Sequence, residues 1–298
     1  MISIFFYLQR HISFSYDYIR PYSRDYLLAF ITVGLILLSG CTTRSEDIYT
    51  KKLNNTHHQQ VYVANDGLPI TLWLSRQQKA SNTIRLYIEG DGRAWLRRNR
   101  VSSDPTPKNR LVHSLMLQDS KIDKAYIARP CQYEKNNTCS PELWTFSRYS
   151  SASIQAINQA ITFIKESKHY HSIELIGFSG GATIALLIAA QRNDIQSVRT
   201  IAGNLDPSYT NTLHRVSPMP TALNPKDFSN RLQHIPQWHF IGKSDPVILP
   251  VIFEHYLSAF KNKRCIKSQL IDHATHHNGW VNIWPKLLQL KLPCDQTP

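Results

Sequence analysis

The stretch from residue 173 to residue 191 limits the fold of this chain more than any other feature of the sequence. A short, mostly apolar run at 173–176 is followed by Gly177-Phe178-Ser179-Gly180-Gly181 and then by an almost wholly apolar segment at 181–191. The run predicts a buried strand, and the segment predicts a helix that is covered on most sides. The small residues around Ser179 allow the backbone to turn sharply between the two. A strand, a tight turn and a buried helix are typical of a nucleophile elbow, in which the serine hydroxyl is exposed at the end of the strand.

Strand-like and helical segments alternate through most of the chain. Strands are expected at residues 60–64, 70–74, 84–89, 124–128, 173–176, 198–202, 237–241 and 266–271. Helices are expected at 109–117, 153–166, 181–191, 250–260 and 280–290. This alternation predicts an α/β fold with a mostly parallel eight-stranded sheet and helices on both faces. The hydrophobic fraction of 42% is enough to fill such a core and excludes a largely disordered chain. We expect a single domain at residues 60–298.

The first 40 residues are typical of a targeting segment. Three arginines precede a short apolar stretch at 27–38, which ends in Leu38-Ser39-Gly40-Cys41. A positive region, a short apolar region and small residues before a cleavage site describe a secretory signal. The Leu-Ser-Gly-Cys motif resembles a bacterial lipobox, in which the cysteine is lipidated and becomes the mature N-terminus. A transmembrane anchor is the alternative, but the stretch is shorter than the roughly 20 apolar residues that cross a bilayer. We therefore expect a lipoprotein signal peptide at 1–40, lipidation of Cys41 and a polar tether at 41–59.

Cysteine usage is consistent with export. Lipidation of Cys41 leaves Cys131, Cys139, Cys265 and Cys294, an even number that suits an oxidising compartment. Four cysteines allow three pairings. Cys131 and Cys139 flank a turn-rich segment, and Cys265 and Cys294 flank the last expected strand and helix, so we expect the disulfides Cys131–Cys139 and Cys265–Cys294. A metal site is the alternative, but no Cys-x-x-Cys or Cys-His spacing favours it.

The charge of the chain does not indicate nucleic-acid binding. The 34 lysines and arginines outnumber the 21 aspartates and glutamates, which gives a net charge of +13, yet only 18% of the residues are charged. The positive balance arises from a shortage of acids and not from a basic run. A nucleic-acid-binding surface requires concentrated positive charge, so we expect no nucleic-acid partner.

A nucleophilic serine requires a base, and the base requires an acid that orients it. In enzymes built on a nucleophile elbow, the chain order is serine, acid, histidine. Asp245 follows the strand expected at 237–241, at the carboxyl end where open α/β sheets place their sites. Asp206, which follows the preceding strand, is the rival acid. We expect Asp245 to be the acid because it lies one strand before the histidine-rich loop.

The loop after the last expected strand contains His273, His276 and His277. A histidine in this loop is placed where the base belongs, and we expect His276 to be the base, with His277 as the second choice. Three histidines also suit a zinc site. However, ligands on one short loop without a carboxylate partner form a poor cage, so we expect no metal.

An oxyanion that develops at the elbow requires two N–H groups, one from the residue after the nucleophile and one from the loop after the third strand. The third expected strand leads into Glu89-Gly90-Asp91-Gly92-Arg93-Ala94-Trp95. The glycines of this loop allow the backbone to approach a substrate closely. We expect the backbone N–H groups of Asp91 and Gly180 to form the oxyanion hole.

These segments together resemble the α/β-hydrolase superfamily, and specifically a poorly characterised group of bacterial α/β-hydrolase-fold lipoproteins. The resemblance rests on the lipobox, residues 89–95, Arg129-Pro130-Cys131-Gln132-Tyr133, residues 177–181, Gly203-Asn204-Leu205-Asp206, and His276 four residues before Trp280. It implies an α/β-hydrolase fold and a Ser179–His276–Asp245 triad, and the distance to Trp280 favours His276 over His277. One departure is Glu89, where many esterases have histidine. A carboxylate at this position would repel anionic substrates or hold the loop down.

The sequence therefore predicts an envelope-anchored serine hydrolase that cleaves a carboxylic ester, or else an amide or thioester, without a cofactor. Its expected partners are a small-molecule or lipid ester and the membrane that holds the lipid anchor. In the lipoproteins that the chain resembles, Thr42 in place of aspartate after the cysteine implies the periplasmic face of the outer membrane. The alternative function is a non-catalytic envelope lipoprotein that uses the hydrolase fold as a binding platform.

Overall fold

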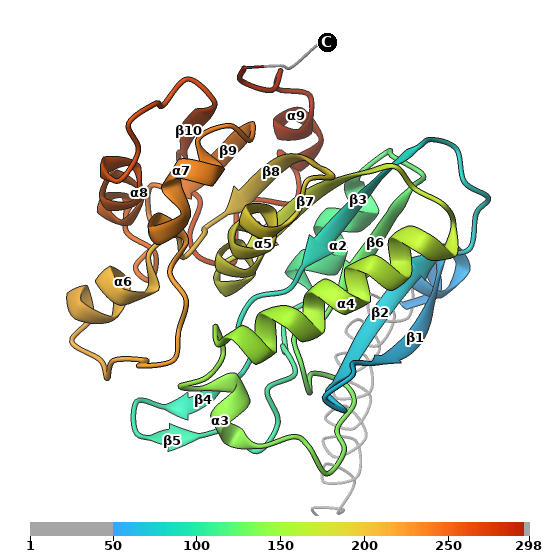
Figure 1. The fold of residues 1–298 in the computed structure, drawn as a ribbon, viewed down its shortest axis with the longest axis horizontal. Helices are drawn as coiled ribbons and strands as arrows, with labels where there is room; N and C mark the ends of the chain where they lie inside the picture. Colours follow the sequence, from blue (N-terminus) through green and yellow to red (C-terminus); the bar gives the residue numbers. More distant parts are fainter. Residues whose placement is uncertain (1–49, 295–298) are drawn as a thin grey trace, which may run out of the picture. The chain divides into compact units, whose positions relative to one another are not determined.

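The computed structural model describes residues 50–294 (Figure 1). Its centre is an eight-stranded sheet in the order β1-β2-β6-β3-β7-β8-β9-β10. Neighbouring strands run parallel from β6 to β10, whereas β2 runs antiparallel to both of its neighbours. The strands are β1 (His57–Val63), β2 (Pro69–Ser75), β3 (Thr83–Ile88), β6 (Lys124–Ile127), β7 (Ser172–Phe178), β8 (Ile195–Ile201), β9 (Gln237–Gly242) and β10 (Ile266–Ile271). The mostly parallel eight-stranded sheet expected from the sequence is confirmed.

The edge strand β1 begins three residues before the expected start of the domain. It starts at His57, which pairs with Ser75 of β2, and its side chains alternate between the two faces of the sheet. Residues 50–56, which precede it, are helical. The polar residues at 57–59 conceal this strand in the sequence, although His57 is buried and only Gln59 of the three is exposed. The ordered domain therefore includes the last part of the segment expected as a tether.

The expected signal peptide at 1–40, Cys41 and the first part of the expected tether lie outside the described residues. Between residues 50 and 294, no helix combines the length and the apolar character that crossing a membrane requires.

Helices cover both faces of the sheet (Figure 1). α4 and α5 contact each other on one face, and α2 and α9 contact each other on the other. The helices are α2 (Leu111–Gln118), α3 (Pro141–Trp144), α4 (Ser151–Ser167), α5 (Gly180–Gln191), α6 (Pro207–Leu213), the 3-10 helix η1 (Pro225–Phe228), α7 (Ser229–Leu232), α8 (Pro250–Ser258) and α9 (Trp284–Leu288). α9 is shorter than the helix expected at 280–290, because Pro285 is tolerated only in the first turn. The short hairpin of β4 (Trp95–Arg97) and β5 (Arg100–Val101) was not expected.

Burial of α5 fixes the position of the turn that precedes it. Every residue from Gly180 to Ala189 is buried, and the helix contacts β3, β7 and β8. The expected helix without a solvent-exposed face is therefore confirmed. Because the sheet and neighbouring helices surround α5, its first residues are held at the carboxyl end of β7.

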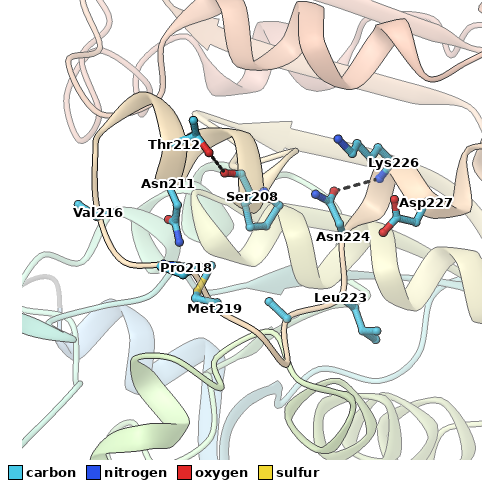
Figure 2. A pocket seen from close by; sticks show the side chains of 12 residues that line it. Ser208, Asn211, Thr212, Val216, Pro218, Met219, Leu223, Asn224, Lys226 and Asp227 are labelled. Carbon is cyan, nitrogen blue, oxygen red and sulfur yellow. Dashed lines mark hydrogen bonds between the residues drawn. The ribbon is translucent and has the colours of Figure 1, made fainter.

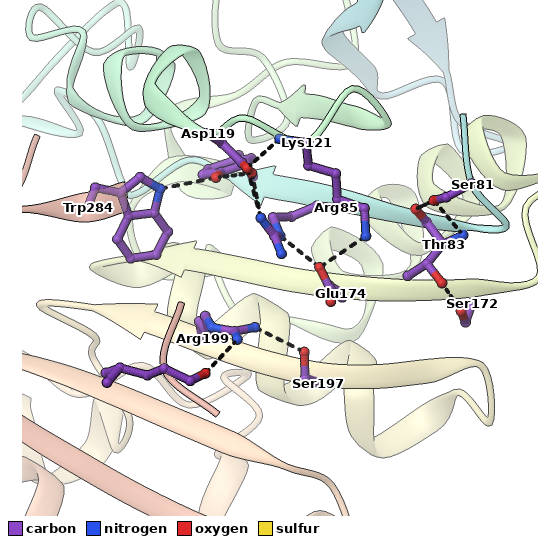
Figure 3. Close-up of polar contacts among 12 residues, drawn as sticks. Ser81, Thr83, Arg85, Asp119, Lys121, Ser172, Glu174, Ser197, Arg199 and Trp284 are labelled. Carbon is purple, nitrogen blue, oxygen red and sulfur yellow. Dashed lines mark hydrogen bonds and ion pairs between the residues drawn. The ribbon is translucent and has the colours of Figure 1, made fainter. Parts of the chain in front are cut away.

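The face of the sheet under α2 and α9 contains an ion-pair network that the sequence did not predict (Figure 3). Arg85 of β3 contacts Asp119, the residue after α2, at 2.8 Å and Glu174 of β7 at 2.7 Å. The hydroxyl of Tyr87 donates to Asp119 at 2.7 Å and accepts from the indole N–H of Trp284 at 3.1 Å. These contacts satisfy charged side chains within otherwise apolar strands, and they attach both helices to the sheet.

Candidate active site

Ser179 lies on a strained turn between β7 and α5. Its φ of 52° and ψ of −120° place a non-glycine residue in a backbone region that L-residues rarely adopt. A Cβ on Gly177 would lie 2.5 Å from the carbonyl oxygen of Gly181, and a Cβ on Gly181 would lie 2.4 Å from that of Ile88. Only glycine fits at these two positions. The local geometry is therefore that of the nucleophile elbow expected from the sequence.

Ser179, His276 and Asp245 form a continuous chain of hydrogen bonds. The Oγ atom of Ser179 lies 3.0 Å from Nε2 of His276, and Nδ1 of His276 lies 2.9 Å from Oδ2 of Asp245. Ser179 follows β7, Asp245 follows β9 and His276 follows β10, so all three lie at the carboxyl ends of parallel strands, with β8 between β7 and β9. An ionised carboxylate only accepts hydrogen bonds, so Nδ1 of His276 donates to Asp245 and Nε2 remains free to accept from the serine hydroxyl.

The surroundings of Asp245 keep its carboxyl ionised. The side chain is almost fully buried, and burial alone would raise its pKa. Hydrogen bonds from His276 and from the backbone N–H groups of Val247 (2.7 Å) and Ile248 (3.0 Å) outweigh burial and hold the pKa below its ordinary value. Asp245 therefore carries the negative charge that a protonated histidine requires as a partner.

The rival acid, Asp206, belongs to a separate group of contacts. Its Oδ2 atom lies 2.7 Å from Nδ1 of His255, on α8, and 3.3 Å from Nζ of Lys226. Its Oδ1 atom caps α6 by accepting from the N–H of Tyr209 at 3.0 Å and also accepts from Asn224 at 2.6 Å. These bonds link α6, α8 and η1, and Asp206 has no contact with His276.

The two other histidines of the last loop do not contact Ser179. His277 is exposed, and its Nδ1 atom accepts from Nδ2 of Asn109 at 3.3 Å. His273 is also exposed and has a positive φ of 60°. The loop is folded by Trp280, whose indole N–H donates to the carbonyl of Thr275 at 2.8 Å. Within residues 50–294, no set of three potential metal ligands is close enough to share an ion.

The loop after β3 lies against the elbow. A Cβ on Gly90 would approach the Cβ of Ser179 to 3.2 Å. In the described part of the chain, the backbone N–H groups of Asp91 and Gly180 make no hydrogen bond. The assignment of these two N–H groups to an oxyanion hole stays a prediction.

The carboxylate of Asp91 is held by three side chains that the sequence did not place at the site. Arg129 and Arg148 each contact it at 3.0 Å, and the hydroxyl of Tyr149 donates to it at 3.0 Å. A Cβ on Gly180 would lie 2.0 Å from Oδ1 of Asp91, so this carboxylate abuts the start of α5. The three partners come from distant loops, and only the motif at 129–133 marked one of them in the sequence.

Glu89 is buried behind the loop and does not face a substrate. Its carboxyl accepts from the N–H of Gly90 at 3.0 Å and from the hydroxyl of Tyr126 at 2.7 Å. Burial raises its pKa to about 7, although both hydrogen bonds and the nearby Arg129 act against the rise. Of the two roles considered for this residue, the contacts support holding the loop down.

Two hollows are lined by residues of the segment that follows β8. Figure 2 shows the larger one, of about 440 Å³, which is lined by α6, the segment after α6 and η1. The smaller one, of about 250 Å³, is lined by Trp95, Phe146, Val216 and Met219, together with Arg148 and other residues. Neither is lined by the triad residues themselves. Arg148, which lines the smaller hollow, also contacts Asp91 in the loop after β3.

Both expected disulfides are present in the structure. Cys131 is joined to Cys139, and Cys265 is joined to Cys294. The first closes a segment that follows β6 and lies beside the loop after β3. The second joins the start of β10 to the segment that follows α9.

A family model identifies the family of the chain, and solved structures show its fold. A family model described as "Serine hydrolase (FSH1)" matches residues 113–278, more than half of the chain. No curated protein sequence matches the chain. Among solved structures, Est1E from Butyrivibrio proteoclasticus, solved with ferulic acid bound, aligns with a TM-score of 0.58 at 14% identity over 77% of this chain and 96% of that one.

Two further structures give the same result. The Pyrococcus furiosus esterase Pf2001 aligns with a TM-score of 0.56 at 14% identity over 80% of this chain and 90% of that one. An α/β serine hydrolase homologue from Coxiella burnetii aligns with a TM-score of 0.54 at 12% identity over 78% and 96%. These likenesses show the α/β-hydrolase fold. The family model spans the segments that contain Ser179, Asp245 and His276, and the chain belongs to the FSH1 serine hydrolase family.

Proposed function

We propose that this serine hydrolase cleaves a carboxylic ester through a Ser179–His276–Asp245 triad. The observation that carries the proposal is the unbroken chain of hydrogen bonds from Ser179 through His276 to the ionised Asp245. An aspartate–histidine contact alone would be weaker support, because buried Asp206 also contacts the half-exposed ring of His255, and among the described residues no serine hydroxyl is hydrogen-bonded to that ring.

In the proposed reaction, Oγ of Ser179 attacks the ester carbonyl while Nε2 of His276 takes the hydroxyl proton. Asp245 stabilises the imidazolium that forms. The N–H groups of Asp91 and Gly180 stabilise the negative oxygen of the tetrahedral intermediate. Collapse of the intermediate breaks the bond to the alcohol, which receives the proton from His276. Water then releases the acid by the same steps, with His276 again acting as base and then as acid.

We infer that the smaller hollow receives the apolar part of the substrate. Trp95, Phe146, Val216 and Met219 supply an apolar lining, and Arg148 connects this hollow to the loop at Ser179. Its volume of about 250 Å³ is below the range of about 300–1,000 Å³ typical of sites for drug-sized ligands. This size favours esters with short acyl or single-ring groups over esters of long acyl chains.

We further propose that the protein is attached to the bacterial envelope by a lipid on Cys41, on the periplasmic face of the outer membrane. The motif Leu38-Ser39-Gly40-Cys41 supports the anchor. Two disulfides support an oxidising compartment, since such bonds persist outside the cytosol.

The triad is tested by a matched pair of variants, Asp245→Asn and Asp206→Asn. Both residues are buried aspartates that contact a histidine ring, but only Asp245 contacts His276. With p-nitrophenyl esters of increasing acyl length, Asp245→Asn should reduce kcat by about 10³–10⁴-fold. Asp206→Asn should stay within about tenfold of the wild type, and Ser179→Ala should show only background hydrolysis.

Two outcomes would contradict the proposal. An equal loss in both aspartate variants, with both shown to be folded by circular dichroism, would refute the choice of acid. A folded wild-type protein that turns over no ester, amide or thioester would refute the enzyme and favour the binding platform.

A further inference from the structure

Gln132 is a buried glutamine whose side chain contacts the loop that supplies the expected Asp91 N–H. Only 1% of Gln132 is exposed. Its Nε2 atom donates to the carbonyl oxygen of Gly90 at 3.1 Å. The carbonyl oxygen of Pro105 lies 3.4 Å from the same Nε2 atom. Its Oε1 atom accepts from the backbone N–H of Arg129 at 3.0 Å. We propose that Gln132 is a positioning residue that orients the N–H of Asp91 toward the oxyanion, an inference that rests on the proposed function.

A single peptide group links the side chain of Gln132 to the Asp91 N–H. The carbonyl of Gly90 and the N–H of Asp91 belong to the same planar trans peptide, so they point in opposite directions. The donor on Gln132 therefore fixes the direction of the Asp91 N–H. The loop lies between the two partners, since a Cβ on Gly90 would meet Ser179 and a Cβ on Gly92 would meet Gln132. A carbonyl held on the Gln132 side directs the N–H toward the elbow.

The backbone around Gln132 is itself firmly held. Its carbonyl accepts from the hydroxyl of Thr71 at 3.1 Å, and its N–H donates to the carbonyl of Arg129 at 3.1 Å. Cys131 and Tyr133 on either side have positive φ values of 66° and 67°. Such conformations are unfavourable for residues other than glycine and persist only where the surroundings impose them. The disulfide from Cys131 to Cys139 closes this segment, so the amide of Gln132 is in place before any substrate binds.

Loss of the Gln132 amide would leave the carbonyl of Gly90 without a donor among the described residues. The Gly90–Asp91 peptide would then be free to rotate, and a rotated peptide presents a carbonyl oxygen to the oxyanion in place of an N–H. The ground-state ester makes little use of this N–H, whereas the tetrahedral intermediate depends on it. Removal of Gln132 should therefore reduce kcat and leave KM nearly unchanged.

The test compares Gln132→Met with Gln237→Met. Gln237 is also a fully buried glutamine with side-chain hydrogen bonds, to Leu232 and Tyr256, but it lies at the start of β9, away from the carboxyl ends of the strands. Methionine keeps the length of the side chain and removes the amide. For ester hydrolysis, Gln132→Met should lower kcat by about 10²-fold, the loss that follows removal of one oxyanion donor, with KM within about twofold. Gln237→Met should keep kcat within about threefold, whatever its loss of thermal stability.

A second measurement reports the oxyanion directly. A trifluoromethyl ketone forms a hemiketal with the active-site serine that carries the negative oxygen, and its affinity should fall in Gln132→Met by the same factor as kcat/KM. If the wild type is active and Gln132→Met keeps the wild-type kcat, or changes only KM, this inference alone is overturned. Equal losses of kcat in both glutamine variants would also overturn it, since they would reflect general destabilisation. A folded wild type without hydrolysis would overturn the proposed function as well.

Discussion

Replacement of Glu89 with glutamine should stabilise the protein at pH 8 much more than at pH 5. Burial raises the pKa of the Glu89 carboxyl from its ordinary 4.5 to about 7 in the folded protein. Between these two values the folded protein keeps a proton that the unfolded chain has released. The contribution of Glu89 to the free energy of unfolding is therefore greatest below pH 4.5 and is lost as the pH rises through 7.

The size of the effect follows from the two pKa values. One pKa unit corresponds to about 1.4 kcal/mol, so ionisation of buried Glu89 costs the folded state about 3 kcal/mol at pH 8 and under about 1 kcal/mol at pH 5. Glutamine removes this cost because it does not ionise. Its amide oxygen accepts from the N–H of Gly90, as the carboxylate does, and its N–H₂ donates to the hydroxyl of Tyr126.

The assay is urea unfolding of wild type and Glu89→Gln at pH 5, 6, 7 and 8. The difference in the free energy of unfolding should grow by about 2–3 kcal/mol from pH 5 to pH 8 in favour of the variant. All other titrating groups are common to both proteins and cancel. Glu134→Gln, at an exposed position, is the control and should shift stability by less than about 0.5 kcal/mol at every pH. A difference between wild type and Glu89→Gln that does not change with pH would refute the reasoning.

Three further predictions concern the base, the anchor and the disulfides. His276→Ala should lower ester hydrolysis by at least about 10³-fold, whereas His277→Ala should stay within about tenfold; similar losses in steady-state kinetics would exclude His276 as the base. Cys41→Ala should abolish incorporation of labelled palmitate in a bacterial host, and normal labelling would exclude the lipid anchor. Cys265→Ser should reduce the free energy of unfolding by about 1 kcal/mol more than Cys139→Ser, because it opens the longer loop; the reverse order in urea unfolding would contradict the entropic argument.

The sheet was predictable because its determinants are local. Most central strands are short runs rich in apolar residues, and the glycines around Ser179 mark a turn that few other residues permit. Once parallel strands are assigned, their carboxyl ends meet at one edge of the sheet. Residues as far apart in the chain as Ser179, Asp245 and His276 could therefore be grouped before any coordinates existed.

The remainder of the site depends on contacts that leave no local pattern. In the sequence, only the family resemblance favours His276 over His277 as the base. The two side chains are neighbours in one loop, and the sequence does not show which of them points toward Ser179. Arg148, which holds Asp91, lies in a segment whose composition does not differ from that of a surface loop. The role of Gln132 depends on the orientation of one peptide, which is set by a hydrogen bond between two distant loops.

Some details of the strands could not be predicted from the sequence, for similar reasons. The start of β1 was missed because its first three residues, 57–59, are all polar although the first of them is buried. The β4–β5 hairpin contains too few residues for alternation to be visible. Arg85 and Glu174 interrupt apolar strands, and only their ion pair across the sheet explains them.

Covalent labelling distinguishes a nucleophilic Ser179 from a structural one. A fluorophosphonate reacts with a serine whose hydroxyl is activated by a neighbouring base, and tandem mass spectrometry locates the adduct. We predict a single adduct per chain, on the peptide that contains Ser179. We also predict that it is absent from Ser179→Ala and strongly slowed in His276→Ala. A folded wild-type protein that forms no adduct, or forms one on a different residue, would contradict the account.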